Sequence, residues 1–235
     1  MRRQVRPQEL RRVSKGRRLV KDPFPGSCAG PRLLSAYAGL AQRGAHLFGD
    51  LLKGQAPRQW EHYPQDDALD TAGGYQWFYH SHSPEDRADA VEHGHVHLFA
   101  RRPLWSRRLR SRAEREFSQL CGLPQATAGS RHLLAISFDA KGVPISLFTV
   151  NSWVTGDLML SAGLTLELLA SMRLDTGYPE IDTVIDSTVH LCLPEISELM
   201  RARDLALVAH TSPNRLEDPS LELLSQIRID LDTKL

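Results

Sequence analysis

The spacing of the apolar residues predicts a long helix near the start of the chain. Between Pro31 and Gly54, apolar side chains recur at helical intervals, at Leu33, Tyr37, Leu40, Leu47, Phe48 and Leu51. Proline is favoured in the first turn of a helix and glycine directly after its last turn, so both residues suit these positions. We therefore expect an amphipathic helix over residues 31–53, followed by a polar, turn-rich stretch over residues 55–73.

The middle of the chain changes to patterns that are typical of strands. Residues 75–82 are rich in aromatic side chains, and residues 93–100 alternate between histidine and apolar side chains. Residues 132–138 and 143–153 are two further β-rich runs, and the turn between them contains Gly142. The sequence therefore predicts two pairs of neighbouring antiparallel strands.

The rest of the chain has mainly helical patterns. They cover residues 103–121, 155–172, 180–192 and 194–204, and a short run with strand character follows at residues 227–231. This order of elements predicts an α+β fold in which helices flank an antiparallel sheet that carries a histidine-rich hairpin. We expect a single metal-binding domain of this class over residues 31–235, preceded by a loosely ordered basic arm over residues 1–30.

The composition limits the class of protein. The chain has 235 residues, of which 41% are hydrophobic and 24% charged, as in ordinary globular proteins. Its three cysteines are too few for a disulfide scaffold of this size. No apolar run reaches the roughly 18 residues of a membrane span, and the N-terminal residues lack the apolar core of a secretory signal. We therefore expect a cytoplasmic protein with a small-molecule substrate and no membrane partner, and its oligomeric state stays open.

The charges are unevenly distributed, although the formal net charge is only +1. Residues 1–21 contain nine lysine or arginine residues against Glu9, and residues 101–115 contain seven arginines against Glu114. Basic segments of this kind can bind a polyanion such as nucleic acid, but they are more often solvated surface. Because Trp105 is the one aromatic residue among them, a stacking platform for bases is not indicated. Polyanion binding is therefore kept as an alternative function.

Histidines are concentrated in the two central strands. Five of the ten lie in two motifs, His80-Ser-His82 and Glu92-His-Gly-His-Val-His97. Alternate residues of a strand share a face, and a hairpin closed by the intervening residues pairs His82 with His93 and His80 with His95. Since paired residues have Cβ atoms about 4.5–5.5 Å apart, these imidazoles are expected to converge on one patch.

A metal ion would account for this concentration of imidazoles. Crowded imidazoles repel one another when protonated, and buried ring nitrogens need partners; a metal removes both problems. His97 falls opposite Phe78 in the same register, nearer the edge of the patch, and we expect it and Glu92 to act in catalysis. We expect the ligands to be His80, His82, His93 and His95.

The residue types narrow the choice of metal. No cysteine lies near the cluster, which disfavours a closed thiolate zinc site. Histidines combined with a carboxylate are typical of non-haem iron, and Glu92 or Glu61 lies close enough in the sequence to supply one. Three histidines with an open position suit catalytic zinc, and histidine-only sets also hold copper. We expect iron as the cofactor, with copper and zinc as alternatives.

Three further residues are expected to contact the substrate or to support the ligands. His62 lies in the polar stretch that precedes the hairpin. His132 begins the third strand, where simple alternation places it on a face with Leu134 and Ile136. Asn151 lies where a strand leads into a helix N-terminus, and such ends bind anions through free N–H groups. The alternatives are a core histidine for His132 and simple helix capping near Asn151.

Four motifs together resemble an uncharacterised bacterial domain family. They are Glu61-His-Tyr-Pro64, His80-Ser-His82, Glu92-His-Gly-His-Val-His97 and Thr149-x-Asn151-x-Trp153-Val-Thr-Gly156. The resemblance covers roughly residues 31–230 and leaves out the basic arm. It implies a coherent fold, but it carries no activity over to this chain.

The histidine cluster thus predicts a mononuclear metalloenzyme that activates dioxygen or water on a small substrate, with a metal-dependent oxidoreductase as the first expectation. The alternative is a metal-binding or sensing module without turnover. An enzyme needs an open coordination position beside a concave pocket, whereas a binding module does not. The structure of the site therefore bears directly on the choice between them.

Overall fold

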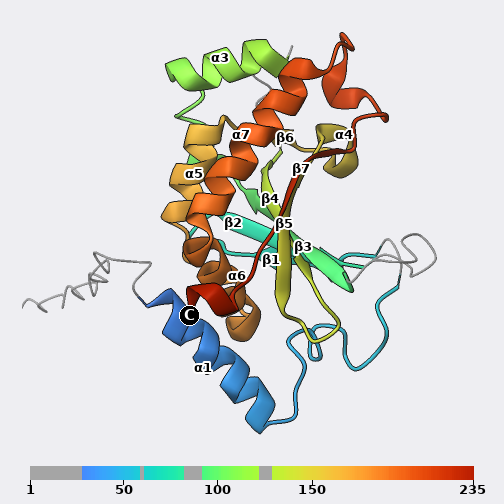
Figure 1. Cartoon of the computed structure of the whole chain (residues 1–235), viewed down its shortest axis with the longest axis vertical. Helices are drawn as coiled ribbons and strands as arrows, with labels where there is room; N and C mark the ends of the chain where they lie inside the picture. Colours follow the sequence, from blue (N-terminus) through green and yellow to red (C-terminus); the bar gives the residue numbers. More distant parts are fainter. Residues whose placement is uncertain (1–27, 59–60, 82–91, 122–128) are drawn as a thin grey trace, which may run out of the picture.

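The structure, a computed structural model of the chain, describes residues 28–58, 61–81, 92–121 and 129–235 (Figure 1). Its helices are α1 (Ala29–Gln42), α2 (Arg102–Trp105), α3 (Arg112–Cys121), α4 (Ser152–Thr155), α5 (Ala162–Ala170), α6 (Pro179–Leu191) and α7 (Leu193–Ala209), with 3₁₀ helices η1 (Arg215–Glu217) and η2 (Asp232–Lys234). Its strands are β1 (Tyr63–Leu69), β2 (Tyr75–His80), β3 (Gly94–Ala100), β4 (Arg131–Phe138), β5 (Pro144–Val150), β6 (Leu158–Met159) and β7 (Leu223–Arg228). Most of the predicted basic arm, residues 1–27, lies outside the described residues.

The strands form one sheet in the order β1-β2-β3-β4-β5-β7, and all neighbours in this order are antiparallel. The short strand β6 adds a parallel pairing to β4. This architecture confirms the predicted α+β class with its antiparallel sheet. It also confirms that the two histidine-bearing runs are antiparallel neighbours, β2 and β3.

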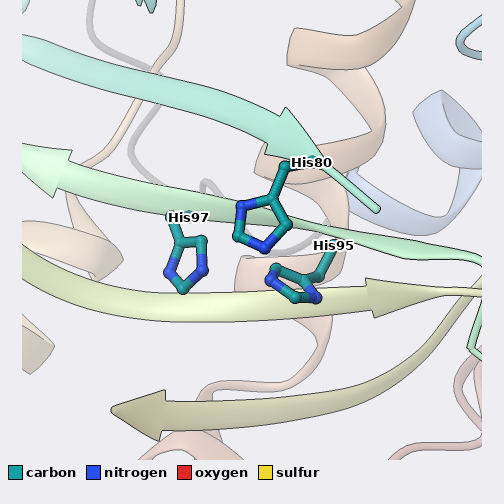
Figure 2. Close-up of side chains that lie close together, drawn as sticks. All are labelled: His80, His95 and His97. Atoms are coloured by element: carbon teal, nitrogen blue, oxygen red, sulfur yellow. The ribbon is translucent and has the colours of Figure 1, made fainter. Parts of the chain in front are cut away.

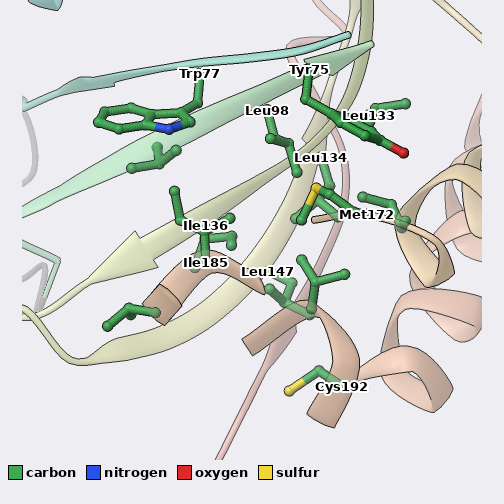
Figure 3. Close-up of a cluster of buried hydrophobic side chains, with 14 of the residues drawn as sticks. Tyr75, Trp77, Leu98, Leu133, Leu134, Ile136, Leu147, Met172, Ile185 and Cys192 are labelled. Atoms are coloured by element: carbon green, nitrogen blue, oxygen red, sulfur yellow. The ribbon is translucent and has the colours of Figure 1, made fainter. Parts of the chain in front are cut away.

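One face of the sheet is apolar and carries the hydrophobic core. Residues that pair across antiparallel strands share a face, and one such row consists of Tyr79, Val96, Ile136, Leu147 and Ile227. This face packs against apolar side chains of α1, α5, α6 and α7, which lie on one side of the sheet (Figure 1). Figure 3 shows Ile185 of α6, and Cys192 between α6 and α7, on the side of Ile136 and Leu147 of the sheet. Removing this apolar area from water is the main driving force for assembling the two layers.

The opposite face carries the histidines. One row across it consists of Phe78, His97, Ala135, Phe148 and Gln226, and the next consists of His80, His95, Ser137, Ser146 and Arg228. Because the core is built on the other face, this face is left for the candidate site.

The first helix is shorter than its apolar spacing predicts. Helix α1 ends at Gln42, and Gly44 takes a positive φ of 59°, a conformation that ends helices readily. The apolar residues that follow, Leu47, Phe48 and Leu51, are still buried in the core, but from turns instead of a helix. Apolar residues that are spaced as in a helix are therefore buried here from turns.

Three other segments also differ from the pattern-based expectation. The stretch expected to be turns contains β1, an edge strand that is only partly exposed and lacks the alternation that would reveal it. The helix expected over residues 103–121 is divided into α2 and α3. The helix expected over residues 155–172 is replaced by the end of α4, by β6 and by α5, which begins where Ser161 accepts a hydrogen bond from Leu164 N. Among the helices of the described residues, none has both the length and the apolar character needed to cross a membrane.

Candidate metal centre

The β2–β3 hairpin brings three histidines together on one face. His80 pairs with His95 and Phe78 pairs with His97, which is the predicted register. Figure 2 shows the three imidazoles projecting to the same side of the two strands. Their ring centroids are 4.3 Å apart for His80 and His95, 4.8 Å for His95 and His97, and 5.4 Å for His80 and His97. We call His80, His95 and His97 the His triad.

The His triad has the donor atoms and the spacing of a metal site. One ring nitrogen from each histidine lies within 4.8 Å of the other two. A tetrahedral ion with nitrogen ligands at about 2.0–2.1 Å holds those nitrogens about 3.4 Å apart, so they close by at most about 1.4 Å on binding. His95 and His97 are each only 2% exposed. The residues present therefore fit a bound transition-metal ion.

Glu92 holds His95 of the triad through a hydrogen bond. Its Oε1 accepts a hydrogen bond from His95 Nδ1 at 2.5 Å, and its Oε2 accepts one from Ser137 Oγ at 2.9 Å. A carboxylate at Nδ1 fixes the tautomer of the ring, so that the lone pair available for a metal lies on Nε2. Ser137 is the cross-strand partner of His95, and this pairing places its hydroxyl beside the carboxylate. Glu92 thus contacts a triad histidine in the manner of a residue that orients a ligand.

His132 supports His97 in the same way, and its position corrects the prediction from simple alternation. The pairing of β3 with β4 shifts between Leu98 and Phe99, so that Phe99 pairs with His132 instead of Leu133. Such a β-bulge turns the following side chains to the other face. His132 therefore leaves the face of Leu134 and joins that of His97, whose Nδ1 is 3.1 Å from His132 Nε2 in a hydrogen bond.

The electrostatics of the buried rings favour neutral imidazoles. Burial, followed by the neighbouring His95 and His132, holds the pKa of His97 well below its usual value. Burial and the positive charge of Arg203 lower the pKa of His132 to about 3. Both rings are consequently uncharged at neutral pH. Only a neutral imidazole has a lone pair for a metal, so no proton has to be displaced from His97.

The other predicted site residues lie at different distances from the triad. His93 is exposed, and its Nδ1 forms a hydrogen bond with Tyr79 Oη at 3.1 Å, apart from the triad. His62 stacks on Phe78 with 3.6 Å between ring centroids and lies 6.3 Å from His80. Asn151 is buried; its Oδ1 accepts from Ser152 N, and its Nδ2 donates to two backbone carbonyl groups, those of Arg215 and Leu221. His82 lies outside the described residues.

A cavity of about 390 Å³ opens in front of the triad. The three histidines of the triad and His62 are among the residues that line it. The other lining residues come from β2, β5, α4, β7 and the residue directly before β7: Phe78, Phe148, Val150, Val154, Thr155, Glu222, Leu223 and Gln226. The candidate metal-binding groups thus lie in the wall of a concave pocket that is lined by both polar and apolar side chains, a common setting of small-molecule sites.

Sequence reasoning missed the residues that complete this site from distant strands. Ser137 and Phe148 lie on the histidine face because of the strand order β3-β4-β5, which alternation alone does not reveal. Alternation within residues 132–138 does separate Ser137 from Leu134 and Ile136, and this signal was available. Glu222 and Gln226 had no such signal, because β7 begins four residues before the strand expected at residues 227–231.

A sheet with α1, α5, α6 and α7 on one face and a histidine triad in a pocket on the other defines an α+β protein with a candidate metal-binding site. The chain belongs to the DUF6969 family, a domain of unknown function, whose model matches residues 28–229. This match is consistent with the resemblance to an uncharacterised family seen in the motifs. No curated protein and no solved structure matches the chain. Arguments about function therefore depend on the site itself.

Proposed function

We propose that this protein is a metal-dependent enzyme in which the His triad holds one divalent transition-metal ion beside the site of a small substrate. The observation that carries the proposal is the position of the triad in the wall of the 390 Å³ cavity. A metal site that serves only to stabilise a fold has its coordination completed by protein ligands, whereas a catalytic site keeps a position for water or substrate. Three histidine ligands facing a cavity suit the second case.

The donor set favours zinc over iron. The expectation of iron depended on a carboxylate ligand, but Glu92 hydrogen-bonds His95 and Ser137. Glu61 is also engaged elsewhere, since its carboxylate contacts Arg58 and Tyr63. Three imidazoles without a carboxylate, among the residues that the structure describes, match the ligand set of catalytic zinc. We therefore propose zinc first, with iron and copper as the metals to compare against it.

Other residues of the chain orient the ligands and limit the water around them. Zinc held by three imidazoles lowers the pKa of a bound water to about 7 and so supplies a nucleophile at neutral pH. Glu92 and His132 orient His95 and His97 through their Nδ1 atoms. The aromatic rings of Phe78 and Phe148 limit the water around the triad, which strengthens electrostatic interactions there.

The proposal is tested by asking whether the bound metal has an exchangeable position. Protein that has been stripped with a chelator is loaded with one equivalent of cobalt(II), which reports its coordination through visible absorption bands. Free imidazole, a small neutral ligand, is then added. We expect a saturable change in the bands, with cobalt retained by the protein after desalting. We expect no specific cobalt bands in His95→Ala, whereas His190→Ala should behave like the wild type.

His190 is a suitable control because it is similarly buried, at 6% exposure, but lies on α6 among the helices that cover the other face of the sheet. Cobalt bands that do not respond to imidazole would contradict the enzyme proposal and support a closed, non-catalytic metal-binding module. Failure of the wild type to bind cobalt, zinc or iron would contradict both the enzyme proposal and the alternative of a metal-binding module.

A further inference from the structure

The cavity extends across the sheet from the His triad toward β7. In the row that crosses the site face, His97 pairs with Ala135, Ala135 with Phe148, and Phe148 with Gln226. Adjacent strands lie about 4.8 Å apart, so the backbone of Gln226 is roughly 14 Å from that of His97. The cavity therefore runs from the triad past Phe148 to β7.

The middle of the cavity is apolar. The Phe148 ring lies 5.1 Å from the His95 ring and 6.0 Å from the His97 ring, measured between centroids. Val154 of α4 packs against Phe148 and Val150 in a small apolar cluster on this face. At about 390 Å³, the cavity is near the lower end of the usual range for ligand pockets. It suits one ring-sized apolar body.

The end of the cavity toward β7 carries polar side chains and one carboxylate. Glu222 directly precedes β7 and Gln226 lies on it, and both line the cavity together with Leu223 and with Thr155 of α4. Glu222 is the only acidic residue among the described residues that line the cavity, and none of them is lysine or arginine. A carboxylate attracts an ammonium group or a neutral hydrogen-bond donor and repels a carboxylate or phosphate at the same place.

We propose that the cavity selects small molecules that have an apolar, ring-sized body and a hydrogen-bond donor, above all an ammonium group, at the end remote from the triad. Glu222 receives the donor, while Phe148 and Val154 contact the body. The inference rests on the proposed function, because it takes the same cavity to be the substrate site. It names the substrate class: small neutral or cationic amphiphiles, not organic anions.

The experiment uses the metal-free chain, so that attraction of anions to a metal does not contribute. Phenethylamine, phenethyl alcohol and phenylacetate share a ring and differ in the charge of the end group. Their dissociation constants are measured at neutral pH from NMR chemical-shift titrations. We expect phenethylamine to bind tightest and phenylacetate weakest, with roughly a two- to fivefold difference between them, as for an exposed ion pair.

Two charge-neutralising variants isolate the role of Glu222. Glu222→Gln should abolish the preference for phenethylamine over phenylacetate. Glu217→Gln removes the same charge from an exposed residue of η1 that does not line the cavity, and it should keep the preference. Val154→Trp, which fills the middle of the cavity, should weaken the binding of all three compounds.

Three results would overturn the inference: equal affinities for the three compounds, a preference for phenylacetate, or a preference that survives in Glu222→Gln as it does in Glu217→Gln. Absence of saturable binding of all three would also overturn it. Because no metal is present, these failures leave the cobalt experiment unaffected. Conversely, a chain that binds no metal can still show the predicted preference, so the two proposals fail separately.

Discussion

Two of the three triad imidazoles are held in place through their Nδ1 atoms, each by a different neighbour. His95 is bound by the carboxylate of Glu92, and His97 is bound by the imidazole of His132. Partners of this kind orient the ring and raise its basicity toward a metal, and their loss typically lowers metal affinity by about 10- to 100-fold. The role of Glu92 is therefore measurable without a substrate.

We expect Glu92→Gln to weaken zinc binding by about 10- to 100-fold while leaving one zinc per chain at saturation. The amide removes the negative charge beside His95 Nδ1 but keeps the size of the side chain. Competition with a chromophoric chelator measures the affinity. Glu61→Gln is the control, because its carboxylate contacts Arg58 and Tyr63 and not the triad. Equal zinc affinity in Glu92→Gln and the wild type would show that Glu92 has no part in the site.

At the level of single residues, the sequence predicted much of the site. The two motifs and strand alternation sufficed to place His80 against His95 and His97 opposite Phe78. They did not show that His97 joins the triad and His93 does not, because both residues are two positions from His95 in the strand pattern. The difference arises at the start of β3, because His93 precedes the strand and forms a hydrogen bond with Tyr79. Ligand roles for individual histidines therefore stay predictions until metal binding is measured.

The hairpin itself depends on a close approach at Gly94. A Cβ at this position would lie 2.8 Å from the carbonyl oxygen of His80 and would also collide with the Tyr79 hydroxyl. A backbone oxygen cannot move aside as a flexible side chain can, so only glycine allows β2 and β3 to approach this closely beside the pair His80 and His95.

We expect Gly94→Ala to separate the strands at this point, lowering both the melting temperature and the zinc affinity. Gly163→Ala is the matched control, because a Cβ there meets nothing within 4 Å. Calorimetry and zinc titration of the two variants provide the comparison. If Gly94→Ala matched the wild type in both measurements, the close approach would not be a requirement of the site.

The elements that escaped prediction did so for local physical reasons. No turn residue marks the β-bulge beside Leu98, so alternation placed His132 on the wrong face. Strand β1 lies at a sheet edge with Gln65, Asp66 and Asp67 in its middle, so it lacks a hydrophobic pattern. By contrast, helices α6 and α7 separate at Cys192, two residues before Pro194, and the sequence located both within a few residues apart from the end of α7.

For the whole molecule, the division of the sheet into an apolar and a histidine face has a consequence for stability. Burial and Arg203 lower the pKa of His132 to about 3, whereas an unfolded chain restores it to about 6.5. Between these values the unfolded chain binds a proton that the folded chain does not. The free energy of unfolding is therefore fully retained above about pH 6.5 and decreases as the pH falls toward 3.

We expect His132→Asn to flatten this pH dependence in the metal-free protein, because one proton fewer is taken up on unfolding. The free energy of unfolding in urea, measured at several pH values below about 6.5, gives the slope. His46→Asn, which alters a histidine outside the cluster, serves as the control. The interpretation fails if His132→Asn keeps the slope of the wild type, whatever its absolute stability.

The most direct test of the central claim is the zinc-to-chain ratio of His97→Ala after equilibrium dialysis at a buffered zinc concentration that just saturates the wild type. Loss of one of three nitrogen ligands should lower the affinity by at least roughly tenfold, so the account predicts a ratio far below one for His97→Ala. It predicts a ratio near one for the wild type and for His190→Ala. If His97→Ala bound one zinc per chain under the same conditions, the triad on the sheet face would not be the metal site.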